Sequence, residues 1–485
     1  LGKSDEEIAV YDELAARFAE ADQPELRLQV AMALGNKGAV LGQLGKADEA
    51  ITVYDDLAAR FAEAEEPELR VRVAGALYNK GVVLGQLGKS DEAITVYDDL
   101  AARFAEAEEP ELRVQVAMAL VNKGAVLGQL GKADEAIAVY DELTGRFIDA
   151  AEPELRVQVA KALHNKGAVL GQLGKADEAI TVYDDLAARF AEAEEPELRV
   201  IVGTALVKKG VVLGQLGKPD EAIAVYDDLA ARFAEAEEPE LRVQVANALH
   251  NKGVVLGQLG KSDEAMAVYD DLAARFAEAE EPELRVQVAS ALGNKGVVLG
   301  QLGKSDEAMA AYDELTGRFI DAAEPELRVQ AARALVNKGV VLGQLGKPDK
   351  AIPIYDDLIA RFGDSPEPGL KETVADTYSS LCAALISVWR ATGNADSLEQ
   401  AVRAGREAVA RGQNRYNLAC ALALSGILDE GFDNLEAALE REKTEWRTVV
   451  ADEDWDQLRT HPRYLALEKK FAENENSNHD QPKET

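Results

Sequence analysis

One tyrosine recurs every 43 residues along most of this chain, and no other feature constrains the fold as strongly. Eight near-identical copies occupy residues 1–344, each opening on Leu-Gly-Lys, and a ninth, diverged copy extends to residue 387. We therefore expect residues 1–387 to form nine tandem repeats of one structural unit. The tyrosines that mark the copies are Tyr11, Tyr54, Tyr97, Tyr140, Tyr183, Tyr226, Tyr269, Tyr312 and Tyr355.

The third copy, residues 87–129, indicates what that unit is. Two apolar sets follow the i, i+3, i+4, i+7 spacing of a helix face, and Pro110 separates them. Proline is tolerated in the first turn of a helix but not in its interior, so a second helix is predicted to begin at Pro110 and to run to Gln129. The two sets are Ala93, Ile94, Tyr97, Leu100, Ala101 and Phe104, and then Leu112, Val116, Ala119, Leu120 and Leu127.

Each repeat is thus predicted to be a pair of antiparallel helices of about 16–20 residues apiece. A pair this small cannot bury both of its apolar faces alone, so neighbouring pairs must stack and share a continuous core. The predicted fold is an all-α solenoid without strands. Leu1 stands inside such a unit and is not an initiator methionine, and we expect an N-terminal portion to precede it.

Residues 119–140 resemble the tetratricopeptide repeat (TPR) family. The resemblance recurs in register throughout residues 1–387, and it implies a right-handed superhelical solenoid whose concave groove binds other polypeptides. The positions that match the family's bulky, small, large apolar, alanine and aromatic residues are Leu120, Gly124, Leu127, Ala136 and Tyr140.

Two departures from the family pattern matter. The period of 43 exceeds the usual value of about 34 residues, so the superhelix pitch cannot be carried over. A lysine also stands where the family has a large apolar residue, and we expect its stem to pack while its ammonium group reaches a nearby aspartate. These lysines are Lys37, Lys80, Lys123, Lys166, Lys209, Lys252, Lys295 and Lys338.

The C-terminal part of the chain looks related but diverged. Residues 416–439 resemble a further TPR unit, and residues 446–464 are similar to the closing segment of some TPR arrays. Residues 388–471 are therefore predicted to form a capping unit, packed by Trp389, Trp446 and Trp455. Residues 472–485 are polar and are predicted to be disordered.

A net charge of −35 argues against nucleic acid and anionic membranes as partners. The two cysteines, Cys382 and Cys420, lie in apolar helical patterns, which is typical of small buried side chains in a reducing, cytoplasmic compartment. No apolar run is long enough to span a membrane. The acidic corner at Glu106, Glu108, Glu109 and Glu111 is interpreted as a solvated edge, with a docking strip for basic partners as the alternative.

The second helix of each repeat carries two positions that vary most between copies, and both lie on one helix face. By resemblance to the TPR, that face is the concave one that contacts ligands; the alternative is neutral drift at exposed sites. The first set is Met32, Gly75, Met118, Lys161, Thr204, Asn247, Ser290 and Arg333, and the second is Gly35, Tyr78, Val121, His164, Val207, His250, Gly293 and Val336.

An asparagine follows the second variable position in seven of the eight copies, and Lys208 replaces it in the fifth. An amide both donates and accepts, so a row of them can pair with the backbone of an extended peptide, as in the asparagine ladder of some long TPR superhelices. Alternatively, each amide only bonds a neighbouring helix. The candidate peptide-binding residues are Asn36, Asn79, Asn122, Asn165, Asn251, Asn294 and Asn337, with Tyr78, Met118, Lys161, His164, Asn247, His250 and Arg333.

The chain shows no catalytic set. Residues 81–90 superficially suggest a phosphate-binding loop, but Val83 stands where its first glycine must be. The four histidines are isolated, so no metal site or triad is expected. The two-carboxylate clamp of some TPR domains is also not expected, because Lys208 replaces its second asparagine and Asn247 and Asn251 replace its basic pair.

The sequence therefore predicts a protein-interaction scaffold that binds another protein or peptide, and neither an enzyme nor a binder of cofactors, small-molecule substrates, nucleic acid or membranes. One alternative is the sensor array of a larger signalling protein whose effector domain precedes Leu1. A purely structural spacer or self-assembling array is another.

Overall fold

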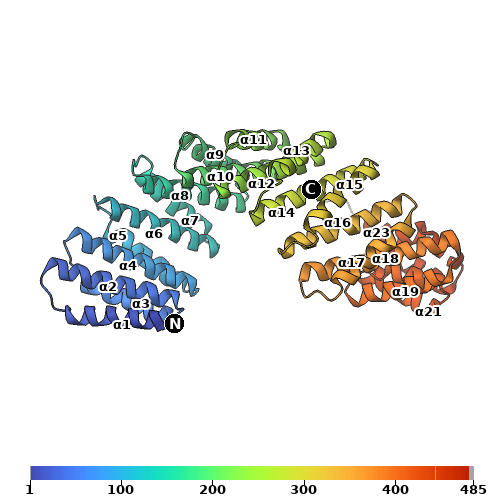
Figure 1. The fold of residues 1–485 in the computed structure, drawn as a ribbon, viewed down its shortest axis with the longest axis horizontal. Helices are drawn as coiled ribbons and strands as arrows, with labels where there is room; N and C mark the ends of the chain where they lie inside the picture. The colour runs from blue at the N-terminus through green and yellow to red at the C-terminus, as the bar shows by residue number, and fades with distance from the viewer. Residues whose placement is uncertain (1, 443, 480–485) are drawn as a thin grey trace. The chain divides into compact units, whose positions relative to one another are not determined.

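The structure, a computed structural model, describes residues 2–442 and 444–479. Within these residues the chain forms helices joined by short turns and contains no strand (Figure 1). The prediction of an all-α helical solenoid is confirmed. None of the described helices combines the length and the apolar character that a membrane crossing requires.

Each near-identical repeat contributes one long helix of 20 residues and one short helix of 14 to 16 residues. The long helices are α2 (Pro24–Gln43), α4 (Pro67–Gln86), α6 (Pro110–Gln129), α8 (Pro153–Gln172), α10 (Pro196–Gln215), α12 (Pro239–Gln258), α14 (Pro282–Gln301) and α16 (Pro325–Gln344). The short helices are α1 (Gly2–Arg17, 16 residues), α3 (Ala47–Arg60), α5 (Ser90–Arg103), α7 (Ala133–Phe147), α9 (Ala176–Arg189), α11 (Pro219–Arg232), α13 (Ser262–Arg275) and α15 (Ser305–Phe319).

Proline and glycine set the bounds of the long helices, as the sequence predicts. Pro110 occupies the first turn of α6. After Gln129 the chain turns at Gly131, whose φ of 73° lies in the left-handed region. The N–H of Gly131 bonds the carbonyl of Gly128 and the N–H of Lys132 bonds that of Leu127, which is a Schellman motif. Apart from α1, the short helices of the repeats have fewer residues than the 16–20 predicted. Helix α5 ends at Arg103, and the backbone has left helical geometry at Phe104, where φ is −110°.

Short helices pack between two long helices, as α5 does between α4 and α6. Tyr97 is 2% exposed, and its ring lies directly against the backbone of Gly81 in α4. A methyl group at Gly81 would overlap that ring, so the glycine is required by close approach. Equivalent contacts join Gly124 to Tyr140 and Gly296 to Tyr312.

A recurring ion pair links short helices to the long helix that follows them. Lys123 Nζ lies 2.5 Å from Asp98 Oδ1, and the lysine side chain is 16% exposed while the aspartate is 52% exposed. This arrangement confirms the prediction that the lysine stem packs while its ammonium group reaches an aspartate. The same pair recurs at Lys37–Asp12, Lys80–Asp55, Lys166–Asp141, Lys209–Asp184, Lys295–Asp270 and Lys338–Asp313.

A second ion pair links successive long helices. Arg70 of α4 bonds Glu109, the residue before α6, and its guanidinium lies over the ring of Phe104. Glu109 is half-buried, whereas Glu106, Glu108 and Glu111 are exposed. The acidic corner is thus solvated at three positions and is part of the packing at the fourth. Equivalent pairs are Arg27–Glu66, Arg113–Glu152, Arg156–Glu195, Arg199–Glu238, Arg285–Glu324 and Arg328–Glu367.

The chain divides into two compact units, Leu1–Asn251 and Lys252–Thr485, and the boundary falls inside α12. In the second unit the near-identical repeats give way to a C-terminal region, which begins with the diverged ninth copy and keeps no 43-residue spacing after residue 387. Its elements are α17 (Pro348–Phe362), α18 (Pro368–Thr392), α19 (Ala395–Ala410), α20 (Tyr416–Leu424), α21 (Leu428–Arg441), α22 (Trp446–Ala451), the 3-10 helix η1 (Glu453–Leu458) and α23 (Pro462–His479).

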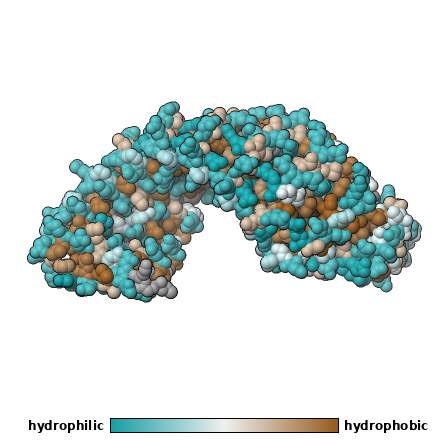
Figure 2. Space-filling model, viewed as in Figure 1, coloured by the Kyte–Doolittle hydropathy of each residue, from teal (hydrophilic) through white to brown (hydrophobic). Residues whose placement is uncertain are grey.

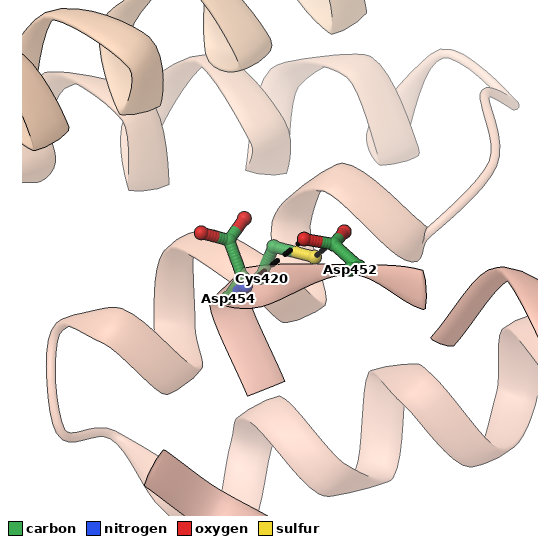
Figure 3. Close-up of side chains that lie close together, drawn as sticks. All are labelled: Cys420, Asp452 and Asp454. Atoms are coloured by element: carbon green, nitrogen blue, oxygen red, sulfur yellow. Dashed lines mark hydrogen bonds between the residues drawn. The ribbon is translucent and has the colours of Figure 1, made fainter. Parts of the chain in front are cut away.

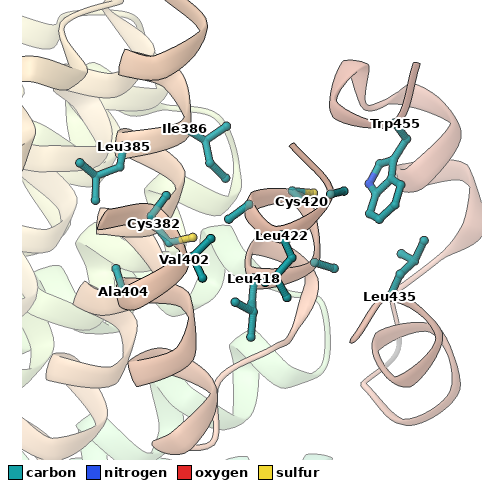
Figure 4. Close-up of a cluster of buried hydrophobic side chains, with 14 of the residues drawn as sticks. Cys382, Leu385, Ile386, Val402, Ala404, Leu418, Cys420, Leu422, Leu435 and Trp455 are labelled. Atoms are coloured by element: carbon teal, nitrogen blue, oxygen red, sulfur yellow. The ribbon is translucent and has the colours of Figure 1, made fainter. Parts of the chain in front are cut away.

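A large apolar cluster packs much of the C-terminal region together (Figure 4). Cys382 and Cys420 are buried in it and unbridged, as the sequence predicts. Trp446 and Trp455 are buried as well, whereas Trp389 is only half-buried. Helix α23 includes residues 472–479 of the segment predicted to be disordered, and residues 480–485 lie outside the described residues.

Candidate peptide-binding face

The candidate binding residues lie on one side of the long helices. We call this surface the Asn face and define it by the asparagine of each long helix with the residues one and four positions before it. On α6 these are Asn122, Val121 and Met118, of which Val121 is buried and the others are half-buried. Long helices α4 and α6 contact each other directly, so their Asn positions lie side by side.

Each described unit carries part of the asparagine row. In the first unit, Asn36 and Asn79 are exposed, and Asn122, Asn165 and Asn251 are half-buried. In the second unit, Asn294 and Asn337 are half-buried. All seven side chains therefore remain open to solvent in part.

Tyrosine hydroxyls hold the amides in place. The amide nitrogen of Asn122 donates to the hydroxyl of Tyr78, 3.1 Å away. Burial raises the pKa of Tyr97 of α5 to about 12, and the nearby amide of Asn122 opposes that rise. An asparagine amide likewise opposes the rise in the pKa of the buried tyrosine at Tyr140 with Asn165, Tyr226 with Asn251, Tyr269 with Asn294 and Tyr312 with Asn337.

This contact uses only some of the hydrogen-bond donors and acceptors of each amide. An amide has two N–H donors and a carbonyl oxygen with two lone pairs, so groups remain for a ligand after one intramolecular bond. The bond also fixes the orientation of the side chain, which lowers the entropy cost of binding. The two interpretations of the asparagines, as internal bonding partners and as ligand contacts, are therefore compatible.

The charged candidates on the Asn face have carboxylate partners in the next repeat. Lys161 Nζ lies 2.7 Å from Glu197, and Arg333 lies 3.3 Å from Glu372. His164 and His250 are half-buried, and burial lowers the pKa of both. Tyr78 and Asn247 are half-buried like Met118, whereas Arg333 is exposed.

Exposed valines accompany the asparagines, a feature that sequence reasoning missed. Val297 and Val340 are 40% and 42% exposed, and each stands three residues after an asparagine of the second unit. They therefore lie on the same side of the helix as Asn294 and Asn337. Figure 2 shows polar residues over much of the visible surface, with apolar patches among them. The signal that could have found these valines is the variation between alanine and valine at this position.

Sequence reasoning also missed the continuation of the face into the C-terminal region. Ser380 occupies the position of the asparagine in the ninth copy, and Asn417 of α20 donates its amide to the backbone oxygen and hydroxyl of Ser379, at 3.2 and 3.1 Å. Ser379 and Asn417 line two adjoining cavities of about 350 and 270 Å³. The 43-residue spacing from Asn337 could have identified Ser380.

Among the described residues, Cys420, Asp452 and Asp454 form one cluster with the spacing of metal ligands (Figure 3). The carboxylates of Asp452 and Asp454 already accept hydrogen bonds from other side chains of the protein. Arg390 Nε donates to Asp454 Oδ1 at 2.8 Å, and the Tyr416 hydroxyl donates to Asp452 Oδ2 at 2.8 Å. Burial raises the pKa of the Cys420 thiol well above its ordinary value, which disfavours the thiolate that binds metal. These side chains fit a hydrogen-bonded link between α18, α20 and η1 better than a metal centre.

Comparison with known proteins bears on the repeats. A family model described as the tetratricopeptide repeat matches residues 36–108, 78–151, 207–280, 250–325 and 294–366, and a second model of the same description matches residues 160–187. These stretches cover more than half of the chain. A search of curated proteins found no match.

Solved structures similar to this chain share little sequence with it. BtubC from P. vanneervenii is 18% identical over 50% of this chain and 93% of its own, with a TM-score of 0.38. A tetratricopeptide repeat protein from Parabacteroides merdae is 17% identical over 63% and 98%, with a TM-score of 0.33. A signal transduction ATPase with numerous domains and a tetratricopeptide repeat sensor, from Pyrococcus horikoshii, is 12% identical over 78% and 54%, with a TM-score of 0.42.

Proposed function

Because this chain belongs to the tetratricopeptide repeat family, we propose that it is a protein-interaction scaffold whose Asn face holds an extended peptide or a helix of a partner protein. The observation that carries this proposal is the repeated, partly solvent-exposed amide, which lies near a tyrosine in one long helix after another and at Asn122 donates to the hydroxyl of Tyr78. A row of oriented amides can bond the backbone of an extended peptide whatever its side chains are.

The amides alone supply limited affinity. A hydrogen bond nets about 0.5–1.5 kcal/mol, so four of them contribute about 2–6 kcal/mol. Micromolar binding requires about 8 kcal/mol, and association also costs rigid-body and side-chain entropy. The partner must therefore bury apolar surface as well, and exposed residues such as Val297 and Val340 offer it. We expect a partner that alternates backbone contacts with apolar side chains over several repeats.

The test uses a variant in which Asn79, Asn122, Asn165 and Asn251 are all changed to Ala. The wild-type chain and the variant are used to capture proteins from a lysate, and circular dichroism checks that both are equally helical. The proposal expects proteins that the wild type captures to be lost from the variant. Capture of the same set by both would show that the amides are structural only.

A matched control changes residues on the short helices instead. Thr52, Thr95 and Thr181 are exposed, and other copies carry alanine at this position, at Ala138 and Ala224. The variant with all three threonines changed to Ala should capture the same proteins as the wild type. Loss of capture in this control would place the binding surface on the short helices.

A further inference from the structure

The asparagine row is broken once within the eight near-identical copies, at Lys208 of α10. Although the chain carries a net charge of −35, the charged residues at the positions that define the Asn face are Lys161, Lys208 and Arg333, all of them basic. The face is thus an uncharged strip with a few positive charges on a strongly acidic protein.

Lys208 differs from the other two bases. Lys161 and Arg333 are paired with Glu197 and Glu372. Lys208 is exposed, and within the part of the chain that the structure describes no carboxylate lies within ion-pair distance of its nitrogen. The neighbouring residue, Lys209, already forms an ion pair with Asp184, whose Oδ1 lies 2.5 Å from the lysine Nζ.

A second polar group without a partner lies next to Lys208. His164 of the preceding long helix, α8, has its Nδ1 buried and without a hydrogen-bond partner in the described structure. Its ring lies 6.2 Å from that of Tyr183 of α9. His164 and Lys208 stand at the positions of α8 and α10 that correspond to Tyr78 of α4 and Asn122 of α6, which hydrogen-bond at 3.1 Å. Burial lowers the pKa of His164, and the positive charge of Lys208 lowers it further. The exposed ammonium group of Lys208 is therefore the charged group that a ligand can reach at this point on the face, and His164 below it adds no negative charge.

We propose that the peptide held on the Asn face carries an acidic side chain at the position that lies against Lys208. This inference rests on the proposed function, because it names the chemistry of the partner at one repeat. A carboxylate would form a charge-assisted hydrogen bond with the ammonium group, which is about twice as strong as a neutral one. More distant acidic residues of the chain are screened over about 8 Å at physiological ionic strength, so the local charge decides the preference.

The inference gives Lys208 a role in register as well as affinity. The asparagines bond any peptide backbone and cannot distinguish one position of a uniform peptide from the next. A single cation in the row favours the alignment that puts an acidic residue opposite it, and it disfavours a basic residue there.

The experiment selects peptides from a random 12-residue library displayed on phage, with the full chain as bait. Lys208→Asn restores the residue of the seven other copies and should preserve the fold. Lys209→Asn is the control, because it removes an adjacent charge that is already paired with Asp184. We expect the wild type and Lys209→Asn to enrich Asp or Glu at one peptide position, and Lys208→Asn to lose that enrichment only.

The selected peptide is then compared with its analogue in which the acidic residue is changed to the amide. The wild type should bind the acidic form at least about fivefold more tightly, which is roughly 1 kcal/mol, and Lys208→Asn should show no preference. Peptides selected without acidic enrichment, or an enrichment that survives Lys208→Asn, would overturn this inference alone. Selection of no peptide by the wild type would overturn the proposed function, and this inference with it.

Discussion

The near-identical repeats and the C-terminal region bury their side chains in different ways. In the repeats, the same few contacts recur: a tyrosine against a glycine, a lysine on an aspartate and an arginine on a glutamate. In the C-terminal region the contacts occur once, as with Trp455 against Phe432 and Arg390 on Asp454. Contacts between neighbours spread stability along an array, whereas a unique cluster concentrates it in a few residues. This difference makes the effect of a substitution depend on its region.

The largest effect is expected for Trp455→Ala. Trp455 is fully buried at 0% exposure, and removing a buried tryptophan costs about 3–5 kcal/mol. Urea unfolding followed by circular dichroism should show early loss of structure in the C-terminal region, with the repeats intact. Trp389→Ala is the control, and its half-buried side chain should cost clearly less. Equal losses in the two variants would contradict the view that one cluster closes the chain.

A smaller effect is expected for Gly81→Ala in the repeats. The new methyl group would overlap the ring of Tyr97, and overpacking of this kind costs about 1–3 kcal/mol. Gly85 lies one turn later on α4 with open space around it, so Gly85→Ala should raise stability by up to about 1 kcal/mol through helix propensity. Thermal unfolding of both variants checks the pair. If both variants shift the midpoint in the same direction, the tyrosine–glycine contact is not what sets the repeat packing.

The repeats should also respond to mild acid through His164 and His250. The pKa of each is lowered in the folded chain, so the unfolded chain binds more protons and stability falls as pH drops below 6.5 toward the folded values. The slope for one histidine cannot exceed about 1.4 kcal/mol per pH unit. His164 faces the Tyr183 ring and Lys208. Urea unfolding between pH 7.5 and 5.5 should show a smaller loss of stability for His164→Val than for the wild type. Valine stands at this position in three other copies.

The smallest effect is expected for the exposed ion pairs of the turns. Lys132 lies 3.5 Å from Asp91, and both side chains are largely exposed, so Lys132→Ala should cost about 0–1 kcal/mol. Screening should abolish even this difference at 1 M salt. Thermal midpoints at low and high salt provide the measurement. A loss above about 2 kcal/mol would mean that the turns, and not the buried contacts, hold successive repeats together.

Much of the repeat could be predicted because its determinants are local. Pro110 marks the start of a helix and Gly131 the turn after its end. The spacing of Leu112, Val116 and Leu120 identifies the buried side of that helix. The pairing of Lys123 with an aspartate followed from a charged group on a packed position. Each of these inferences needs only the sequence within one repeat and the rules of helix geometry.

Other contacts could not be predicted, because they depend on how units stack. The sequence predicts that Glu109 is one of four solvated glutamates. In the structure, the register of α4 against α6 places Arg70 beside it. The hydrogen bond from Asn122 to Tyr78 likewise joins two repeats, and the sequence around neither residue predicts it. The Arg390–Asp454 pair spans 64 residues of a region without a repeat, so no internal comparison could reveal it. Sequence patterns define elements well, whereas tertiary register decides which polar groups meet.

The central claim is that the Asn face binds the partner, and a photo-crosslinking residue tests it most directly. It is placed in turn at Met118, on the Asn face of α6, and at the exposed Asp99 on α5, and each chain is irradiated with peptides selected on the wild type. The account predicts a crosslink from position 118 that excess unlabelled peptide abolishes, and none from position 99. Crosslinking from position 99 without any from position 118 would contradict it.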